Sequence, residues 1–290
     1  MFRKAERLKA KLRLAITGPA GSGKTYGALL IAKGLGGKIA MIDTESGSGD
    51  LYSDLADYDI QNINAPFTVQ KYITAIREAE NEGYDILIID SLSHVWSGEG
   101  GLLDMQGKIT DTGKGNSYTA WRHVTPWYNR LVDTMLNSNC HIIATMRSKT
   151  EYAQIQNERG KTEIKKLGLA PVQRDGMDYE FTTVFDISMT HDVTVSKDRT
   201  SIFDGKIFVI SEETGKILKN WLESGKELNN DLKTPSREII KNLYNSYLEI
   251  SGNDQQRAQD LMLAITNGKN SKDWDDNDIK NLIDHLSNIK

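Results

Sequence analysis

The sequence predicts an α/β fold with an open, mostly parallel twisted sheet, an antiparallel β extension and a small C-terminal helical module. Short apolar runs alternate with helical patterns over the first half of the chain. Strand patterns follow one another between positions 179 and 210, with a turn signal at Asp204-Gly205. Beyond position 236, apolar residues recur at helical spacing.

A stretch with Gly, paired Asn and Pro at 224–235 is typical of a linker. We therefore expect a core over residues 1–223 that begins with a basic N-terminal segment, a linker over 224–235 and a helical module over 236–290. Three helices are expected in the module, the first of them carrying Ile240, Leu243 and Tyr247 on one face.

The composition limits the class of protein. The chain has 290 residues and a formal net charge of -4, so any binding of nucleic acid must come from local basic patches. Its single cysteine, Cys140, lies in an apolar run, which excludes a disulfide framework and favours a core position in a reducing cytosol. Since no apolar stretch is long enough to span a membrane, we expect a cytoplasmic protein without membrane contact.

The first predicted strand, 12–16, runs into Gly18-Pro19-Ala20-Gly21-Ser22-Gly23-Lys24-Thr25, which fits the spacing GxxxxGK[ST], and a helix is predicted over 26–35. Glycines allow backbone N–H groups to converge on phosphate oxygens at a helix N-terminus. Lys24 is expected to reach the β and γ phosphates, and Thr25 to offer its hydroxyl to Mg²⁺. The expected nucleotide contacts here are Gly18, Gly21, Ser22, Gly23, Lys24, Thr25 and Tyr26.

Three later strands are predicted to end near the same site. The strand at 38–45 ends on Asp43 and Glu45, and after a helix at 69–81 the strand at 84–91 has four apolar residues before Asp90. Because parallel strands place functional residues at their carboxyl ends, Asp90 is the expected magnesium carboxylate. The strand at 141–146 would leave Thr145 near the γ phosphate.

Two polar segments interrupt this pattern. Residues 97–117 are rich in Gly, Thr, Asp and Lys and are expected to form a long mobile segment before a helix at 118–136. Residues 147–174 contain seven Lys or Arg against three Glu, which is locally basic in an acidic protein. We expect a polar loop there.

The order of these motifs resembles that of the RecA-like recombination ATPases, and most closely their short phage-encoded relatives that anneal single-stranded DNA. The similarity rests on the phosphate loop, Ile42-Asp43-Thr44-Glu45, Ile88-Ile89-Asp90-Ser91 and Tyr179-Glu180-Phe181, and spans residues 12–210. It implies a RecA-like P-loop NTPase core that hydrolyses ATP with Mg²⁺ at the subunit interfaces of a homo-oligomer, either filament or ring. It also implies single-stranded DNA as a partner, a single-strand-binding protein as a further candidate, and the cytosol of a phage host as the location.

The resemblance also assigns residues. Glu45 matches the family's glutamate that polarises the attacking water, a role that nearby Asp43 could share. Tyr52 falls where the family packs an aromatic ring against adenine. Lys197 and Arg199 resemble the basic pair that is inserted into a neighbour's nucleotide site, where it would stabilise charge on the γ phosphate.

Two further features relate to assembly and DNA. Phe2-Arg3-Lys4-Ala5 resembles a Phe-x-x-Ala peg that links recombinase subunits, but a basic amphipathic N-terminal helix is the preferred interpretation. We expect single strands to bind through 97–117 and 147–174, mainly by backbone contacts. The candidate DNA-binding residues are Arg147, Lys149, Arg159, Lys161, Lys165, Lys166 and Arg174.

Two other functions remain open at this point. A ring-forming DNA helicase or helicase loader would share every nucleotide motif. A nucleotide-controlled adaptor would use ATP only to order a surface for a protein partner. Directional unwinding of a forked duplex would identify the helicase, and an ATPase rate indifferent to DNA would identify the adaptor.

Overall fold

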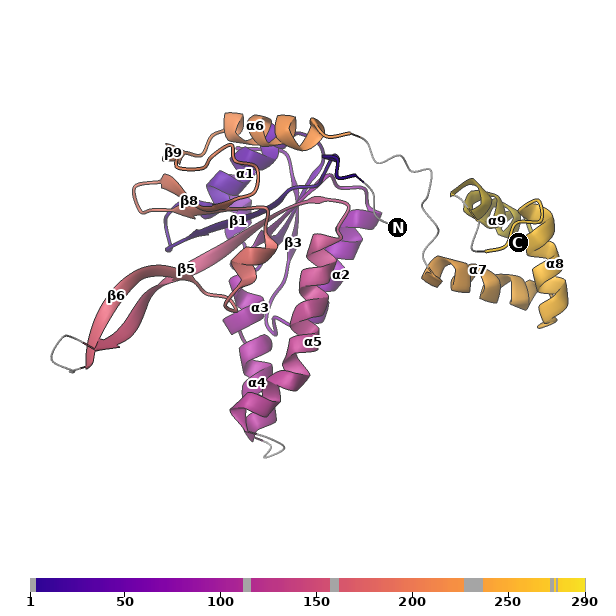
Figure 1. The fold of residues 1–290 in the computed structure, drawn as a ribbon, viewed down its shortest axis with the longest axis horizontal. Helices are drawn as coiled ribbons and strands as arrows, with labels where there is room; N and C mark the ends of the chain where they lie inside the picture. The colour runs from indigo at the N-terminus through magenta and orange to yellow at the C-terminus, as the bar shows by residue number, and fades with distance from the viewer. Residues whose placement is uncertain are drawn as a thin grey trace. The chain divides into compact units, whose positions relative to one another are not determined.

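A computed structural model describes residues 4–111, 116–156, 162–226, 237–271, 274 and 276–289. The chain divides into two compact units, Met1–Lys226 and Glu227–Lys290, which are described separately (Figure 1). Candidate residues Arg159 and Lys161, and positions 227–235 of the expected linker, lie outside the described residues.

The first unit is built around one sheet. Its described strands are β1 (Arg13–Gly18), β2 (Ile39–Asp43), β3 (Asp59–Asn62), β4 (Ile86–Asp90), β5 (His141–Gln156), β6 (Thr162–Pro171), β7 (Thr183–Ile187), β8 (Asp192–Asp198) and β9 (Phe208–Val209). Its described helices are α1 (Lys24–Leu35), α2 (Val69–Asn81), α3 (Ser93–Ser97), α4 (Leu102–Asp111), α5 (Ser117–Leu136) and α6 (Glu212–Glu223), with 3-10 helices η1 (Ser48–Tyr52) and η2 (Met177–Glu180).

The strand order is β3-β2-β4-β5-β1-β7-β8-β9, with β6 paired to β5. Neighbouring strands from β3 to β7 run parallel, whereas β8, β9 and β6 pair antiparallel with their neighbours. The predicted α/β class, with a mostly parallel sheet and an antiparallel extension, is confirmed. The carboxyl ends of β1, β2, β4 and β5 therefore lie at the same edge of the sheet.

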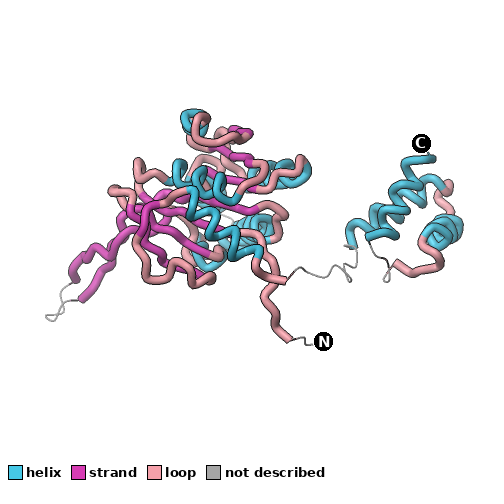
Figure 2. The backbone as a smooth tube through the Cα atoms, turned by 90° about the horizontal axis from the view of Figure 1, so that it is seen from above, coloured by secondary structure: helices cyan, strands magenta, loops and turns pink. Residues whose placement is uncertain are grey.

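Helices cover both faces of this sheet, as Figures 1 and 2 show. One apolar cluster joins α2 and α5 to the face that carries Ala15, Leu87 and Ile142. The other joins α1 and α6 to the face that carries Leu14 and Ile16. Because side chains alternate between faces, strands buried on both sides are apolar at nearly every position, which explains the run in β4.

Residues 97–117 are not the long mobile segment that the sequence predicted. Helix α4 covers residues 102–111 of this segment, and Asp104 near its start accepts a hydrogen bond from Gly100 N at 2.8 Å. Leu102 is buried, and Met105 and Ile109 pack against the same core cluster. The composition is polar, but these three residues have the helical spacing that buries one face. Residues 112–115 lie outside the described part.

Residues 147–174 were predicted to form a loop, and this prediction was wrong. Strand β5 continues to Gln156 and pairs antiparallel with β6, with a register shift between Glu151 and Tyr152. Pairing across the hairpin satisfies backbone N–H and C=O groups that a long loop would leave to water. Figures 1 and 2 show this β5–β6 hairpin projecting from the rest of the first unit.

Three other local features differ from the predictions. The N-terminal segment forms no helix over residues 4–12; instead, Lys9 N donates to Lys226 O at 2.9 Å. Strand β3 was not predicted, because it lies at the edge of the sheet and its sequence has no alternating apolar pattern to indicate a strand. Helix α6 was also missed, although Leu218 and Leu222 are buried.

The second unit contains α7 (Arg237–Ile250), α8 (Gln255–Ile265) and α9 (Asp276–Ile289) among its described residues. Their apolar faces meet in a core of their own, formed by Leu243, Tyr247, Ala258, Met262, Trp274 and Leu282. The hydroxyl of Tyr247 donates to Leu282 O at 2.9 Å, which ties α7 to α9. The unit therefore has the hydrophobic core that an independent helical module requires.

Candidate ATP and magnesium site

The loop between β1 and α1 has the geometry that its glycines predict. Gly21 and Gly23 have φ values of +80° and +90°, a region that favours glycine. A Cβ on Gly18 would lie 2.5 Å from Ser22 Oγ and 2.7 Å from the carbonyl oxygen of Ile187. A side chain at any of these three positions would therefore strain or displace the loop.

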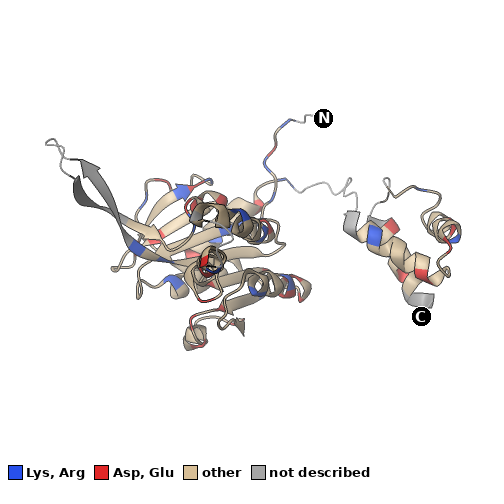
Figure 3. Cartoon of the chain, turned by 90° about the horizontal axis from the view of Figure 1, so that it is seen from below, with Lys and Arg blue, Asp and Glu red and all other residues tan. Residues whose placement is uncertain are grey.

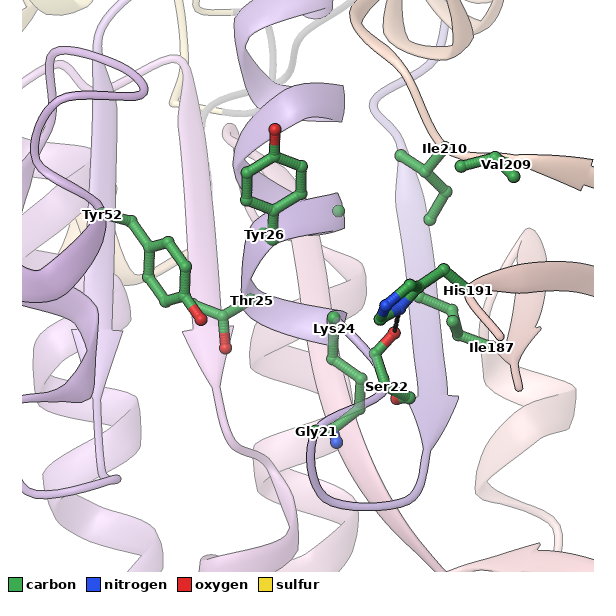
Figure 4. Close-up of a pocket in the computed structure, with 12 residues that line it drawn as sticks. Gly21, Ser22, Lys24, Thr25, Tyr26, Tyr52, Ile187, His191, Val209 and Ile210 are labelled. Atoms are coloured by element: carbon green, nitrogen blue, oxygen red, sulfur yellow. Dashed lines mark hydrogen bonds between the residues drawn. The ribbon is translucent and has the colours of Figure 1, made fainter. Parts of the chain in front are cut away.

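The groups around this loop fit a phosphate chain. Ser22 Oγ is buried without a hydrogen-bond partner in the described part of the chain, so it is free to donate to a phosphate oxygen. Lys24 Nζ donates to Pro19 O at 2.8 Å, which holds the amine at the loop (Figure 4). Burial lowers the pKa of Lys24, although the charges of Asp90 and Glu45 oppose that shift. The loop thus supplies a cation and a hydroxyl beside the N-terminus of α1.

Asp90 accepts hydrogen bonds from two threonines that were expected at the ATP and magnesium site. Its Oδ2 accepts from Thr25 Oγ1 and its Oδ1 accepts from Thr145 Oγ1, both at 2.5 Å. Burial raises the pKa of Asp90, and the two hydroxyl hydrogen bonds act in the opposite direction. A hydroxyl and a carboxylate at the phosphate loop are oxygen donors of the kind that Mg²⁺ prefers. Thr145, expected to contact nucleotide, orients Asp90 through this hydrogen bond.

Glu45, the candidate catalytic base, is paired with Arg147. Arg147 Nε donates to Glu45 Oε1 at 2.9 Å, and Nη2 of the same guanidinium contacts Oε2. Burial raises the pKa of Glu45, but the hydrogen bond and charge of Arg147 outweigh it and hold the pKa below its ordinary value. Arg147, which was predicted to bind DNA, thus has its guanidinium in the ATP site.

Asp43, the alternative base, has a structural role. Its carboxylate accepts from Glu45 N at 2.5 Å and Gly49 N at 3.0 Å, and the residue is 1 % exposed. These bonds fix the turn that carries Glu45. With both oxygens engaged by the backbone, Asp43 is poorly placed to act on water.

A pocket of about 460 Å³ adjoins the phosphate loop, with Tyr26 and Tyr52 on one side (Figure 4). The two rings meet edge to face, with centroids 6.2 Å apart. Ile187 and Ile210 line the other side. The pocket therefore offers aromatic and aliphatic surface next to the phosphate-binding groups, as a purine ring requires.

Two histidines in this region were missed by sequence reasoning. His191 lines the pocket, and its Nδ1 is 2.9 Å from Ser22 O (Figure 4). His94 Nδ1 is 2.7 Å from Thr44 Oγ1, beside Glu45. A signal was available, because both residues closely follow the carboxyl end of a parallel strand, β7 for His191 and β4 for His94.

Lys197 and Arg199, the predicted pair for a neighbour's site, lie away from the phosphate loop of their own chain. Val184 pairs with Lys197, and the neighbouring Thr183 pairs with Leu14 near the amino end of β1. Lys197 Nζ donates to Asp178 O at 3.0 Å, and Arg199 Nη2 donates to Tyr179 O at 3.1 Å. In one subunit, therefore, this pair is not part of the nucleotide site.

The other candidate DNA-binding residues that the structure describes lie on the β5–β6 hairpin or just after it. Lys149 lies on β5 and is exposed, and Lys165 and Lys166 occupy positions on β6 that pair with Ala153 and Tyr152. Arg174 lies just beyond β6, with its guanidinium 4.7 Å from the centre of the Tyr128 ring. Figure 3 shows charges of both signs spread over the rest of this unit.

A family described as an AAA domain matches residues 10–220. The chain belongs to this AAA domain family. Its family and its phosphate loop make it a P-loop ATPase, which confirms the nucleotide-binding part of the sequence-based prediction. Among the described residues of this AAA domain protein, no helix has the length and apolarity to cross a membrane.

No curated protein matches the chain. Among solved structures, the chain is similar to an ATPase from the type III secretion system of pathogenic bacteria, with 13 % sequence identity and a TM-score of 0.38. That similarity covers 95 % of this chain and 81 % of the other.

Proposed function

We propose that this AAA domain protein is a Mg²⁺-dependent ATPase that binds and anneals single-stranded DNA, and that its nucleotide state controls the β5–β6 hairpin. One observation carries the proposal: β5 is continuous from the ATP site into the hairpin. Thr145 on this strand bonds to Asp90, and Arg147, two residues later, bonds to Glu45. Loss of the γ phosphate on hydrolysis would therefore act on the base of the hairpin, where β5 leaves the sheet at Arg147 and Ser148.

In hydrolysis, Glu45 accepts a proton from water while the water oxygen bonds to the γ phosphorus. The bond from that phosphorus to the β–γ bridging oxygen breaks, which yields ADP and phosphate. Lys24 stabilises charge on the phosphate oxygens. Thr25 and Asp90 would hold Mg²⁺, which neutralises phosphate charge when bound.

The Glu45–Arg147 pair gives this reaction a switch. While Arg147 holds both oxygens of Glu45 and lowers the pKa of the carboxyl group, the carboxylate is a weaker base toward water. Arginine binds phosphate as readily as carboxylate, so a DNA phosphate at the base of the hairpin competes for the guanidinium. Release of Glu45 then couples DNA binding to hydrolysis.

The charge pattern supports nucleic acid as the partner. Seven Lys or Arg lie in residues 147–174 against three Glu, although the whole chain has a net charge of -4. Lys149 is exposed on the hairpin. Contacts of this kind bind the phosphate backbone with little sequence preference and weaken with salt.

Assembly into a homo-oligomer belongs to the same proposal. Lys197 and Arg199 lie toward the sheet end opposite the phosphate loop, so they reach a γ phosphate only if it belongs to another subunit. There they would replace backbone carbonyl partners with phosphate oxygens. ATP at subunit interfaces would then make hydrolysis depend on assembly.

The test is fluorescence anisotropy with a labelled thymidine oligonucleotide at several salt concentrations. Replacing Lys149, Lys165 and Lys166 with Ala should weaken binding and reduce the salt slope by about 2, because each single-strand phosphate contact contributes about 0.7. The matched control replaces Lys33, Lys108 and Lys216, exposed lysines in surface ion pairs on three helices. Unchanged affinity and slope in the hairpin variant would contradict the proposal.

A further inference from the structure

A groove of about 940 Å³ lies beside the hairpin, separate from the ATP site. Helices α3 and α5 and the segment after β6 form its walls. The lining residues that matter here are Trp96, Tyr118, Trp121, Arg122, Arg174 and Asp175. The protein's ATPase chemistry does not use them.

The groove exposes flat aromatic surface. Trp96 and Trp121 are stacked, with ring centroids 5.5 Å apart and an interplanar angle of 18°. Neither ring is fully buried, and Tyr118, one turn before Trp121 on α5, is 87 % exposed. Trp96 and Trp121 also pack against the core cluster of α2 and α5, but exposed aromatic surface grouped at a groove is typical of a binding site.

Positive charge accompanies these rings. Arg122 is exposed, and the Arg174 guanidinium lies 5.6 Å from the Trp121 ring centre. Arg174 Nη1 is buried and has no hydrogen-bond partner within the described residues. Asp175 is the acidic residue that lines the groove, so the cations outnumber it.

We propose that this groove stacks unpaired bases of single-stranded DNA on Tyr118 and on the Trp96–Trp121 pair. The inference rests on the proposed function and adds a second kind of contact to it. Every base has a π face, so aromatic platforms bind single strands without selecting a sequence. Arg122 and Arg174 supply charge for the adjoining phosphates.

Continuity with the hairpin identifies the occupant as the strand that the hairpin binds. Arg174 follows the end of β6 by three residues, and Val172 N donates to Arg147 O at 2.6 Å at the base of the hairpin. A strand held by the hairpin therefore passes directly to the groove. A duplex does not fit this site, because its bases are already stacked.

The groove is also connected to the ATP site through α3. This five-residue helix carries Trp96 in the groove and His94 beside Thr44. Ser93 Oγ accepts from Arg147 N at 2.9 Å, and Gln173 Nε2 donates to Leu92 O at 3.0 Å. Movement of Arg147 on hydrolysis would therefore reach the stacking surface as well as the hairpin.

The experiment compares a labelled thymidine oligonucleotide with an abasic oligonucleotide of equal length. Wild-type protein should bind the thymidine strand more tightly, and Tyr118→Ala and Trp121→Ala should each weaken that binding by about 5- to 100-fold. Affinity for the abasic strand should not change. Trp127→Ala is the matched control, since Trp127 lies on the same helix and is 36 % exposed but does not line the groove.

Because Tyr118 is 87 % exposed, its replacement preserves the fold even if loss of Trp121 does not. Equal wild-type affinity for the two strands would overturn the groove assignment while leaving backbone binding by the hairpin intact. Equal losses in Tyr118→Ala and Trp127→Ala would also overturn it. If neither strand binds, both this inference and the proposed function fail.

Discussion

Arg147 and Glu45 are 102 positions apart in the chain, yet Arg147 Nε donates to Glu45 Oε1 at 2.9 Å. Glu45 follows β2, and Arg147 lies where β5 leaves the sheet to enter the hairpin. The pair therefore joins the candidate catalytic base to the proposed DNA-binding element.

Removing the guanidinium should release Glu45 without DNA. We expect Arg147→Gln to raise the DNA-independent ATPase rate and to lose most of the stimulation by single strands. Steady-state hydrolysis with and without oligonucleotide measures both effects. Arg130→Gln is the control, because Arg130 lies on α5 over the Trp127 ring, outside the ATP site. A variant that keeps the wild-type basal rate and the full stimulation would contradict the switch.

The same substitution should change the pH profile. Arg147 holds the pKa of Glu45 below its ordinary value, against the opposing effect of burial. Without Arg147, burial remains and the pKa rises. Since a general base must be ionised, the acidic limb of kcat against pH should move to higher pH in Arg147→Gln. A limb at the wild-type position would show that Glu45 does not control it.

Substitutions at Lys24 and at Glu45 should impair different steps, namely ATP binding and ATP hydrolysis. Lys24 acts on ground-state phosphates, so Lys24→Ala should abolish productive ATP binding. Glu45→Gln should bind ATP normally and hydrolyse it about 10² to 10⁴ times more slowly. Fluorescent nucleotide binding and single-turnover hydrolysis separate the two steps. Normal hydrolysis by Glu45→Gln would move the role of base to another residue.

The ATP site was largely predictable because its residues follow strands in a recognisable order. The loop from Gly18 to Thr25 and the strand ending at Asp90 carry local signals, namely glycine spacing and an apolar run. Long-range partners carry no such signal. The pairing of Arg147 with Glu45 cannot be read from neighbouring residues, since sheet order brings the ends of β2 and β5 together.

The polar segments were mispredicted for a related reason. Composition at 97–117 and 147–174 favoured loops, but the first contains the amphipathic helix α4 and the second pairs as β5 and β6. Polar strands gain their stability from pairing with another strand, and composition alone does not reveal that pairing. The aromatic groove was likewise hidden, because Trp96 and Trp121 lie on different helices.

The stability of the first unit should depend on His141. Its Nδ1 accepts from Leu12 N at 3.0 Å, and burial lowers the pKa of His141 to about 4. An unfolded chain has an ordinary histidine pKa near 6.5, so it binds more protons than the folded state between these values. Stability should therefore fall as pH drops from about 6.5 to about 4, by about 3 kcal/mol from this residue.

His141→Gln provides the comparison, since a glutamine oxygen accepts the same hydrogen bond without titrating. Urea unfolding at pH 7 and pH 4.5 should show a smaller pH effect in the variant than in the wild type. An equal pH effect in both proteins would exclude His141 as a source of acid sensitivity.

Lys197 and Arg199 should act on a neighbouring subunit. Protein with both residues replaced by Ala and protein with Lys24→Ala should each be inactive alone. Mixing them should restore part of the hydrolysis, because some interfaces then combine an intact phosphate loop with an intact basic pair. Light scattering must confirm mixed assemblies. Failure to recover activity at any ratio of mixed assemblies would rule out a role in trans.

The central claim is that the hairpin transmits DNA binding to Glu45. The most direct measurement is the steady-state ATPase rate, with and without single-stranded DNA, of the wild type and of a variant in which a short Gly-Ser turn replaces residues 150–169. DNA should accelerate the wild type and leave the shortened variant at its basal rate. The account would be contradicted if single-stranded DNA left the wild-type ATPase rate unchanged, or if it stimulated both proteins equally.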